Sequence, residues 1–502
     1  MKKNIVFWIN SAGLFFGVAY FLQKNTNLNL YAICDVEDKQ KSFFTQQKLV
    51  DFKQTYFFHD CVKKDKTRIN YEYLRSFEQK YGIDLWKLAI NDRWFYLYND
   101  FYKFTAEEIS SILEQECRFY EEFLENVKPD YLICMDPSTH HHRILYEMCR
   151  NKGIKVLLLT WAKGMGNKMM IAQDATKLDN FDFNKIKSSG KSHKELIDFI
   201  NSLNLQKVKE KIQKQQFSSK SLLLKATVKF LFSQNNNIET HYSYYGRTKL
   251  KVLIKKIIIE IKAKYRQSFI DKNLSRDPVL DVPFVYFPLH MDQEQNPLIT
   301  APFFTNQLEA IRHVVKSLPP GYALYIKEHP HQLLRGWRKI SSYKEILEIP
   351  NVIFIHPEYS SDDLVKNSAL IITISGSTGL EGAFYDKPSI VFSDVRYSVL
   401  PSVYRLNNLD ELPTVIKNNL HKKTSPEYLE KYVTFMSDNS FDVDLIDLLI
   451  NEANSLYYGG FLVDTEISSE KVQEFFDENK EVLEKIAQEY SNKIDNVNST
   501  SH

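Results

Sequence analysis

The sequence predicts an α/β protein with two Rossmann-like domains, a Lys-rich helical insert between them and a helical C-terminal region. Three observations lead to this prediction. A chain of 502 residues is too long for one hydrophobic core and fits two or three domains. Short apolar segments alternate with helical patterns in two separate stretches, which is typical of parallel sheets covered by helices. Between these stretches the pattern changes to polar, Lys-rich helices.

The composition is that of a globular protein. Charged residues make up 25% of the chain, hydrophobic residues 43%, and the mean hydropathy is −0.36, which excludes a polytopic membrane protein and wholesale disorder. The five cysteines include no CxxC pair, so they indicate neither a disulfide framework nor a zinc site. We therefore expect a reducing, cytoplasmic location.

The first apolar run, at 4–23, follows two lysines and superficially resembles a signal peptide or a membrane anchor. A polar loop at 10–13 interrupts it, and a second apolar segment follows at 28–34. We therefore expect a strand, a buried helix and a second strand, the start of a βαβ unit. Two more strands of the same domain are expected at 131–135 and 156–160.

A second alternation of strands and helices begins at Phe284 and includes a Pro319-Pro320-Gly321 turn. The tail after it is mostly helical, with a clear amphipathic segment at 469–489. The expected parts of the chain are a first Rossmann-like domain at 1–175, a basic helical insert at 176–281, a second Rossmann-like domain at 282–412 and a helical C-terminal region at 413–502.

Neither domain contains a complete G-x-G-x-x-G or a P-loop, which argues against dinucleotide-dependent dehydrogenases and P-loop NTPases. Two Rossmann-like domains with a cleft between them are instead typical of nucleotide-sugar glycosyltransferases of the GT-B class. In that arrangement the first domain holds the acceptor and the second holds the donor. Ligands of such sheets bind at the C-terminal ends of the strands.

One such strand end carries the segment Tyr325-Ile326-Lys327-Glu328-His329-Pro330-His331. An imidazole at this place can donate to a phosphate oxygen, and Lys327 can add a positive charge. Pro330 ends the strand and restricts the backbone at His329. The alternative interpretation is an ordinary loop histidine at the exit of a strand.

A second strand end carries Ser375-Gly376-Ser377-Thr378-Gly379 and, one turn later, Glu381. The small residues let the backbone approach an anion, and the first turn of the following helix has unpaired N–H groups. Glu381 is placed to accept from a ribose diol. The alternative is a helix cap with glycines for a tight turn. The two motifs lie in consecutive units of one domain, which makes them more specific together than alone.

These motifs resemble the capsular polysaccharide biosynthesis family, which includes bacterial Kdo transferases. The matching segments lie at 286–290, 293–294, 318–321, 325–330, 374–381 and 387–392. The HP and Ser/Thr motifs are also similar to those of bacterial sialyltransferases and CDP-glycerol polymerases. The resemblance covers about a quarter of the chain. It implies cytidine-nucleotide donors. It also implies that His329 contacts the donor phosphate and stabilises the departing CMP, that Ser377 and Thr378 bind the same phosphate, that Glu381 binds the ribose, and that His290 and Glu294 lie near the cleft.

Transfer to an acceptor hydroxyl needs a base. Asp136, at the end of an expected central strand, is the first candidate and His140 the second. A helix cap or a turn is an equally good interpretation of Asp136. Adjacent histidines on a helix do not face one point, so we expect no metal site at His140-His141-His142. The loop at 163–168 could hold an anionic acceptor or be a plain flexible loop.

The segment 205–266 contains fifteen Lys and Arg but three Glu, with apolar residues interleaved. Without it, the 65 basic and 63 acidic residues of the chain become 50 and 60, so the near-neutral total conceals a basic insert in an acidic body. Basic amphipathic helices favour anionic membrane surfaces. The alternative is a solvated face on helices that pack against the domains. No nucleic-acid-binding motif accompanies the charge.

The function predicted from these observations is a glycosyltransferase. It would transfer an acidic sugar, Kdo or a sialic-type nonulosonate, from a CMP-sugar to a surface glycan such as capsule or lipooligosaccharide. We expect no cofactor and no metal requirement, and a location on the inner face of the cell membrane. The alternatives are a transferase that uses CDP-glycerol or a UDP-sugar and a non-catalytic subunit of a capsule-assembly complex.

Overall fold

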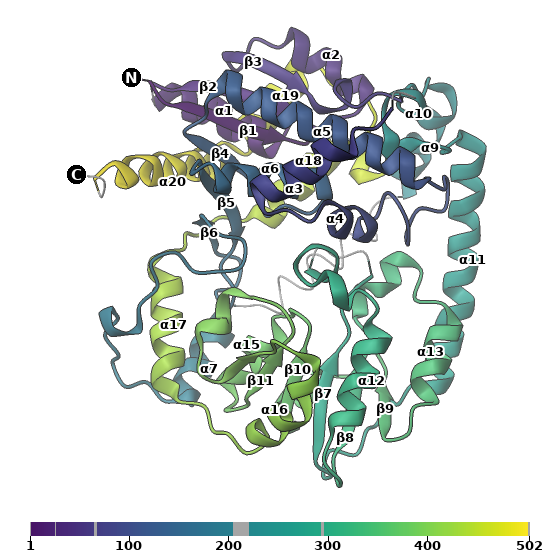
Figure 1. Cartoon of the computed structure of the whole chain (residues 1–502), viewed down its shortest axis with the longest axis vertical. Helices are drawn as coiled ribbons and strands as arrows, with labels where there is room; N and C mark the ends of the chain where they lie inside the picture. Colours follow the sequence, from purple (N-terminus) through teal and green to yellow (C-terminus); the bar gives the residue numbers. More distant parts are fainter. Residues whose placement is uncertain (1, 26, 65–67, 204–219, 293–295, 500–502) are drawn as a thin grey trace.

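The computed structural model describes residues 2–25, 27–64, 68–203, 220–292 and 296–499. It contains two six-stranded sheets that lie one above the other in Figure 1. In each sheet the strands follow the spatial order 3-2-1-4-5-6 of the Rossmann fold. The predicted fold class, an α/β protein with two Rossmann-like sheets in a GT-B-like arrangement, is confirmed.

The first sheet begins with the βαβ unit expected from the sequence. Its first and second strands pair in parallel from Asn4 with Asn29 to Ile9 with Cys34, and the helix between them is almost entirely buried. The run at 4–23 is therefore part of a domain core. The strands are β1 (Asn4–Ile9), β2 (Asn29–Cys34), β3 (Phe52–Phe57), β4 (Tyr131–Met135), β5 (Lys155–Trp161) and the antiparallel β6 (Met169–Ala172).

Helices cover both faces of this sheet, and each face has its own hydrophobic core. One core contains the apolar side of α1, and the other contains α5 and α6. The helices of this part are α1 (Leu14–Asn25), α2 (Asp38–Gln46), α3 (Tyr71–Tyr81), α4 (Leu85–Asn91), α5 (Ala106–Val127) and α6 (His140–Asn151).

The second sheet is parallel throughout. Its strands are β7 (Phe284–Pro288), β8 (Ala323–Lys327), β9 (Val352–Ile355), β10 (Leu370–Thr373), β11 (Ser389–Val391) and β12 (Val403–Arg405). Its helices are α12 (Gln307–Ser317), α13 (Ile340–Leu347), α14 (Ser361–Asn367), α15 (Thr378–Phe384) and α16 (Leu412–Asn419). The order places β7 between β8 and β10, so the ends of these three strands lie side by side.

The insert connects the two sheets through a long helix. It contains α7 (His193–Ser202), α9 (Lys220–Phe232), α10 (Asn237–Thr240) and α11 (Lys249–Asn273). Figure 1 shows α11 along the side of the molecule, beside α9 and α10 of the insert and α13 of the second domain. Before α11, Tyr242 and Tyr245 belong to a core of the first sheet, whereas Ile270 near its end belongs to the core of the second. The helix is thus a strut between the domains.

The C-terminal region is shared between the two domains. Helix α17 (Pro426–Asp438) packs beside α15, and the backbone of Phe441 then pairs with that of Met169. The following helices return to the first sheet, where the Glu452 carboxylate accepts from the Leu14 N–H at 3.3 Å. These helices are α18 (Leu445–Leu456), α19 (Ser469–Glu478) and α20 (Lys480–Ser499), and α20 packs along α1.

Candidate functional site

A cavity of about 500 Å³ lies between the two domains. One wall is the loop after β5, and the other is α15 with α7 and the start of α14. It therefore brings the predicted donor residues Ser377 and Glu381 together with Lys163, from the loop that could hold an acceptor. The lining residues are Trp161, Ala162, Lys163, Gly164, Gly166, Ile197, Ile200, Asn201, Asp362, Ser377, Leu380, Glu381, Phe384 and Tyr385.

The two walls approach each other closely at Gly164. This glycine has a φ of +84°, and a Cβ on it would lie 3.1 Å from Leu380 Cδ2. A larger residue would be strained in conformation and crowded against α15. On the opposite wall, Ser377 Oγ donates to Glu381 Oε1 at 3.0 Å, so both side chains are held at the rim of the cavity. Thr378 follows as the first residue of α15.

The turn after β10 rests on His290, which follows β7. The backbone of His290 is held on both sides by the amide of Gln307, at 2.7 and 3.0 Å. Its Nε2 lies 3.3 Å from Thr373 Oγ1 and accepts from the Ser375 N–H at 3.3 Å. His290 is 5% exposed, so in this structure it supports the Ser/Thr turn from below.

Two glycines allow this turn to fold so tightly. A Cβ on Gly376 would lie 2.8 Å from Thr373 Oγ1, and one on Gly379 would lie 2.9 Å from the hydroxyl oxygen of Tyr397. The Tyr397 hydroxyl also donates to the carbonyl of Gly376. Ser375 is 6% exposed, and its Oγ has no hydrogen-bond partner among the residues that the structure describes.

The HP motif lies at the end of β8, next to the turn of His290. His329 is partly exposed, and its Nδ1 accepts from the His331 N–H at 3.2 Å. Strand β8 ends at Lys327, and Pro330 begins a short 3₁₀ helix, Pro330–Arg335. Lys327 is 4% exposed and donates to Ser361 Oγ at 2.9 Å, which makes it a more buried cation than the sequence suggested. Glu294 lies outside the described residues.

Glu328, between Lys327 and His329, is fully buried, although the sequence analysis gave it no role. Its carboxylate accepts from Arg338 Nε at 2.8 Å, from the Tyr343 hydroxyl at 2.9 Å and from the His329 N–H at 2.7 Å. The ion pair therefore fixes the backbone at the histidine. The available signal was an acidic residue directly after β8 and next to the HP motif.

Asp136 lies at the end of β4 and joins the two domains. Its Oδ1 is 3.2 Å from Arg396 Nη2, and its Oδ2 accepts from the Thr160 hydroxyl at 2.5 Å. Arg396 comes from the second domain and also donates to Thr160 and to the Asp174 carbonyl, at 2.9 and 2.8 Å. The Asp136 carboxylate, 24% exposed, is thus engaged by two donors in this structure.

His140 does not face the cleft, so the prediction that it is the second candidate base needs correction. It is fully buried between Asp92, 2.8 Å from its Nδ1, and Glu116, 3.2 Å from its Nε2. Burial favours the neutral ring, but the carboxylates of Glu116 and Asp92 outweigh this and raise the pKa of His140 to about 10. A side chain without exposed surface cannot take a proton from an acceptor bound in the cavity.

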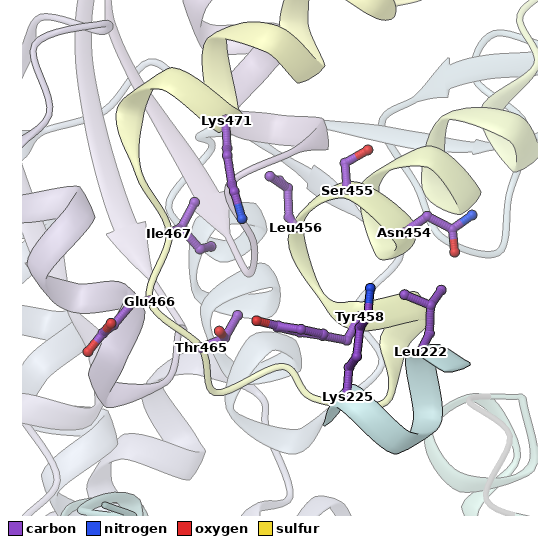
Figure 2. A pocket seen from close by; sticks show the side chains of 10 residues that line it. All are labelled: Leu222, Lys225, Asn454, Ser455, Leu456, Tyr458, Thr465, Glu466, Ile467 and Lys471. Carbon is purple, nitrogen blue, oxygen red and sulfur yellow. The ribbon is translucent and has the colours of Figure 1, made fainter. Parts of the chain in front are cut away.

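A second, smaller cavity of about 180 Å³ lies where α9 meets the C-terminal region. Figure 2 shows the side chains of Lys471 and Lys225 pointing into it from opposite sides. The hydroxyl end of Tyr458 points toward Thr465. The Thr465 hydroxyl has no hydrogen-bond partner among the described residues. None of the predicted donor or base residues lines this cavity, so we give it no part in the reaction.

The fold and the interdomain cavity define a GT-B-like α/β protein. Residues 191–411 match the family model described as "Capsule polysaccharide biosynthesis protein", and this match agrees with the resemblance that the motifs show. No curated protein sequence matches the chain. None of the described helices is both long and apolar enough to cross a membrane.

Similar solved structures include a transferase and two epimerases. A KpsC β-Kdo 2,7-transferase from Thermosulfurimonas dismutans is 12% identical, over 63% of this chain and 79% of that one, with a TM-score of 0.28. The UDP-GlcNAc 2-epimerase of Methanocaldococcus jannaschii is 14% identical over 87% and 100%, with a TM-score of 0.25. That of Neisseria meningitidis, bound to UDP-GlcNAc, is 12% identical over 87% and 99%, with a TM-score of 0.26.

Proposed function

We propose that this protein is a glycosyltransferase that moves an acidic sugar, Kdo or a sialic-type nonulosonate, from a CMP-sugar to a surface glycan. The observation that supports the proposal most strongly is the interdomain cavity. It combines Ser377 and Glu381 of the donor motif with a loop of the other domain that carries Lys163. A donor held on one wall would thus face an acceptor held on the other.

In this proposal the second domain binds the nucleotide. The hydroxyls of Ser377 and Thr378 and the imidazole of His329 donate to the phosphate, and the Glu381 carboxylate accepts from the ribose. As the bond between the anomeric carbon and the phosphate oxygen breaks, negative charge grows on CMP. Donors already aimed at that oxygen stabilise the charge without reorganisation.

Asp136 remains our candidate for the base that removes the acceptor proton. It lies on the acceptor side of the cleft, and its partner Thr160 directly precedes Trp161 of the cavity wall. Its contact with Arg396 makes the role testable, because Asp136→Asn and Arg396→Lys both weaken the interdomain pair. If Asp136 is the base, Asp136→Asn should lower kcat much more than Arg396→Lys does, typically by 10²- to 10⁴-fold. Equal losses of kcat in the two variants would show that Asp136 acts only as an interdomain contact.

The donor is tested with a panel of CMP-Kdo, CMP-sialate, CDP-glycerol and UDP-sugars. Release of the nucleotide is measured with and without a glycan acceptor, and binding of CMP, CDP and UMP is measured by calorimetry. We expect CMP to bind and a CMP-sugar to turn over. If no cytidine donor binds or reacts, the proposed donor class is wrong, and turnover of CDP-glycerol or a UDP-sugar would identify the alternative.

The histidine is tested with His329→Ala and with His331→Ala as a matched control. The two histidines are near neighbours, but only His329 belongs to the motif. We expect His329→Ala to lower kcat with an unchanged melting temperature, whereas His331→Ala retains most of the activity. Equal turnover by wild type and His329→Ala would exclude the proposed role of His329.

We also propose that the protein works at the cytoplasmic surface of an anionic membrane. The predicted segment 205–266 is described from residue 220 onward, and its helix α11 has one buried residue, Ile270. Lysines interleave with large exposed apolar side chains, a combination that binds anionic lipid. The exposed apolar residues of α11 are Leu250, Ile254, Ile257, Ile258, Ile259, Ile261 and Tyr265.

A further inference from the structure

A cluster of buried polar side chains lies beneath the C-terminal edge of the first sheet, apart from the donor motifs. Its centre consists of Glu116 from α5, His140 and His141 from the first turn of α6, and Tyr242 from the segment before α11. These four residues are between 0% and 3% exposed. The proposed transfer reaction uses none of them, so their grouping needs another explanation.

The two adjacent histidines converge because they present different ring nitrogens. His140 presents Nε2, 3.2 Å from a carboxylate oxygen of Glu116, whereas His141 presents Nδ1, 3.0 Å from the Tyr242 hydroxyl. That hydroxyl lies 2.9 Å from Glu116 Oε1, and the ligand atoms of Glu116, His140 and His141 all lie within 4.8 Å of one another. The expectation that the side chains of adjacent histidines do not converge on one point is therefore wrong for His140 and His141.

Each histidine is held from outside by a second carboxylate. Asp92 binds His140 Nδ1 at 2.8 Å, and Asp35 binds His141 Nε2 at 3.1 Å. A carboxylate on the far nitrogen orients a metal-binding imidazole and raises its basicity, and it is one of the usual partners of histidine ligands of metal ions. Here it occurs twice around one centre. In addition, Glu116 Oε2 is buried and, apart from the ion-pair contact with His140 Nε2 at 3.2 Å, has no hydrogen-bond partner among the described residues.

We propose that Glu116, His140 and His141 bind one divalent transition-metal ion, with the Tyr242 oxygen as a fourth ligand. Zinc bound at about 2.0 Å in a tetrahedron has ligand atoms about 3.3 Å apart. Three contacts among these atoms, at 2.9, 3.0 and 3.2 Å, are close to that spacing. Two imidazoles with oxygen ligands suit Zn²⁺ and its first-row neighbours better than Ca²⁺ or Mg²⁺.

The ion has a structural role, because its ligands are buried and none of them lines the interdomain cavity. It ties α5 and α6 to the segment that leads into the strut α11. A structural metal contributes its binding free energy to folding, so its removal loosens the attachment of the strut to the first domain.

The test is the metal content of the intact protein, independent of any glycosyltransferase activity. Elemental analysis after purification without chelator should find about one Zn²⁺ per chain. Stripping it should lower the melting temperature by roughly 5 °C or more, and adding Zn²⁺ should restore it. Co²⁺ in the stripped protein should give the intense visible absorption of a tetrahedral site. Protein that contains no ion, takes up none and melts at the same temperature with and without chelator would overturn the proposal.

Two variants locate the ion. Glu116→Gln keeps the shape of the side chain but removes an anionic ligand, and Asp92→Asn should weaken the affinity for Zn²⁺ by 10- to 100-fold. His142→Gln is the matched control, because His142 is also buried in the same turn but stacks on Trp8, with ring centres 4.7 Å apart. It should retain one ion per chain. An ion that survives Glu116→Gln with unchanged affinity would lie elsewhere, which would refute this site.

Discussion

The buried ion pair behind the HP motif allows the sharpest prediction about stability. Arg338→Met leaves the Glu328 carboxylate fully buried, with Tyr343 and the His329 N–H as its remaining donors. Removal of one partner from a buried pair costs about 3–5 kcal/mol, because an uncompensated charge stays in the interior. For a domain of this size each kcal/mol lowers the melting temperature by about 2–4 °C, so a fall of roughly 6–20 °C is expected.

The assay is thermal and urea unfolding of the full chain, with two comparison variants. Arg312→Met removes an exposed contact with Glu345, at 3.4 Å and with both side chains more than a third exposed, and should cost less than about 1 kcal/mol. The double variant Arg338→Met with Glu328→Gln removes both charges and should recover part of the loss. The reasoning is refuted if Arg338→Met melts within 2 °C of wild type, or if the double variant is no more stable than Arg338→Met.

Three further predictions follow from other contacts. Gly379→Ala should weaken the binding of CMP, measured by calorimetry, with only a small fall in the melting temperature, measured by thermal unfolding, because its Cβ would displace the Tyr397 hydroxyl from the turn after β10. Burial opposes ionisation of Glu430, but hydrogen bonds from Ser188 and Ser189 lower its pKa to about 2; the stability that they contribute is present above pH 4.5 and is lost as the pH falls toward 2, so urea unfolding of wild type and Glu430→Gln should converge over that range. Ile257→Asp should reduce flotation with anionic liposomes severalfold, whereas the control Ile353→Asp, at an exposed position of β9, should not; equal flotation of both would remove the membrane claim.

Features that depend on neighbouring residues were predictable from the sequence. The βαβ unit of β1, α1 and β2 follows from two apolar strands and a buried helix within some 30 residues. The turn after β10 likewise follows from that strand and the glycines directly after it. Strand β3 was not predicted, because its residues Lys53 and Gln54 are exposed at the edge of the sheet and conceal the apolar alternation.

Contacts between distant residues could not be read in the same way. Asp136 looked like a free carboxylate at a strand end, but its partner Arg396 comes 260 positions later, from the other domain. His140 looked accessible after Pro137, but Asp92 and Glu116 enclose it from 48 and 24 positions before. Amphipathic periodicity predicted the helices of the tail. It does not predict which hydrophobic core the apolar face of each helix packs against. The return of α18 to α20 to the first sheet therefore appears only in the structure.

The strut α11 connects the proposed membrane contact to the geometry of the cleft. The helix begins after tyrosines buried in the core of the first domain, and Ile270 near its end is buried in that of the second. Its 25 residues span about 37 Å, so its exposed apolar side chains extend along both domains. A membrane that binds this helix therefore contacts the element that connects the two domains. Docking along α11 would orient the cleft and limit the relative motion of the domains at the same time. The variant Ile257→Asp, which leaves the turn after β10 unchanged, is therefore expected to bind CMP normally but to use a lipid-linked acceptor poorly.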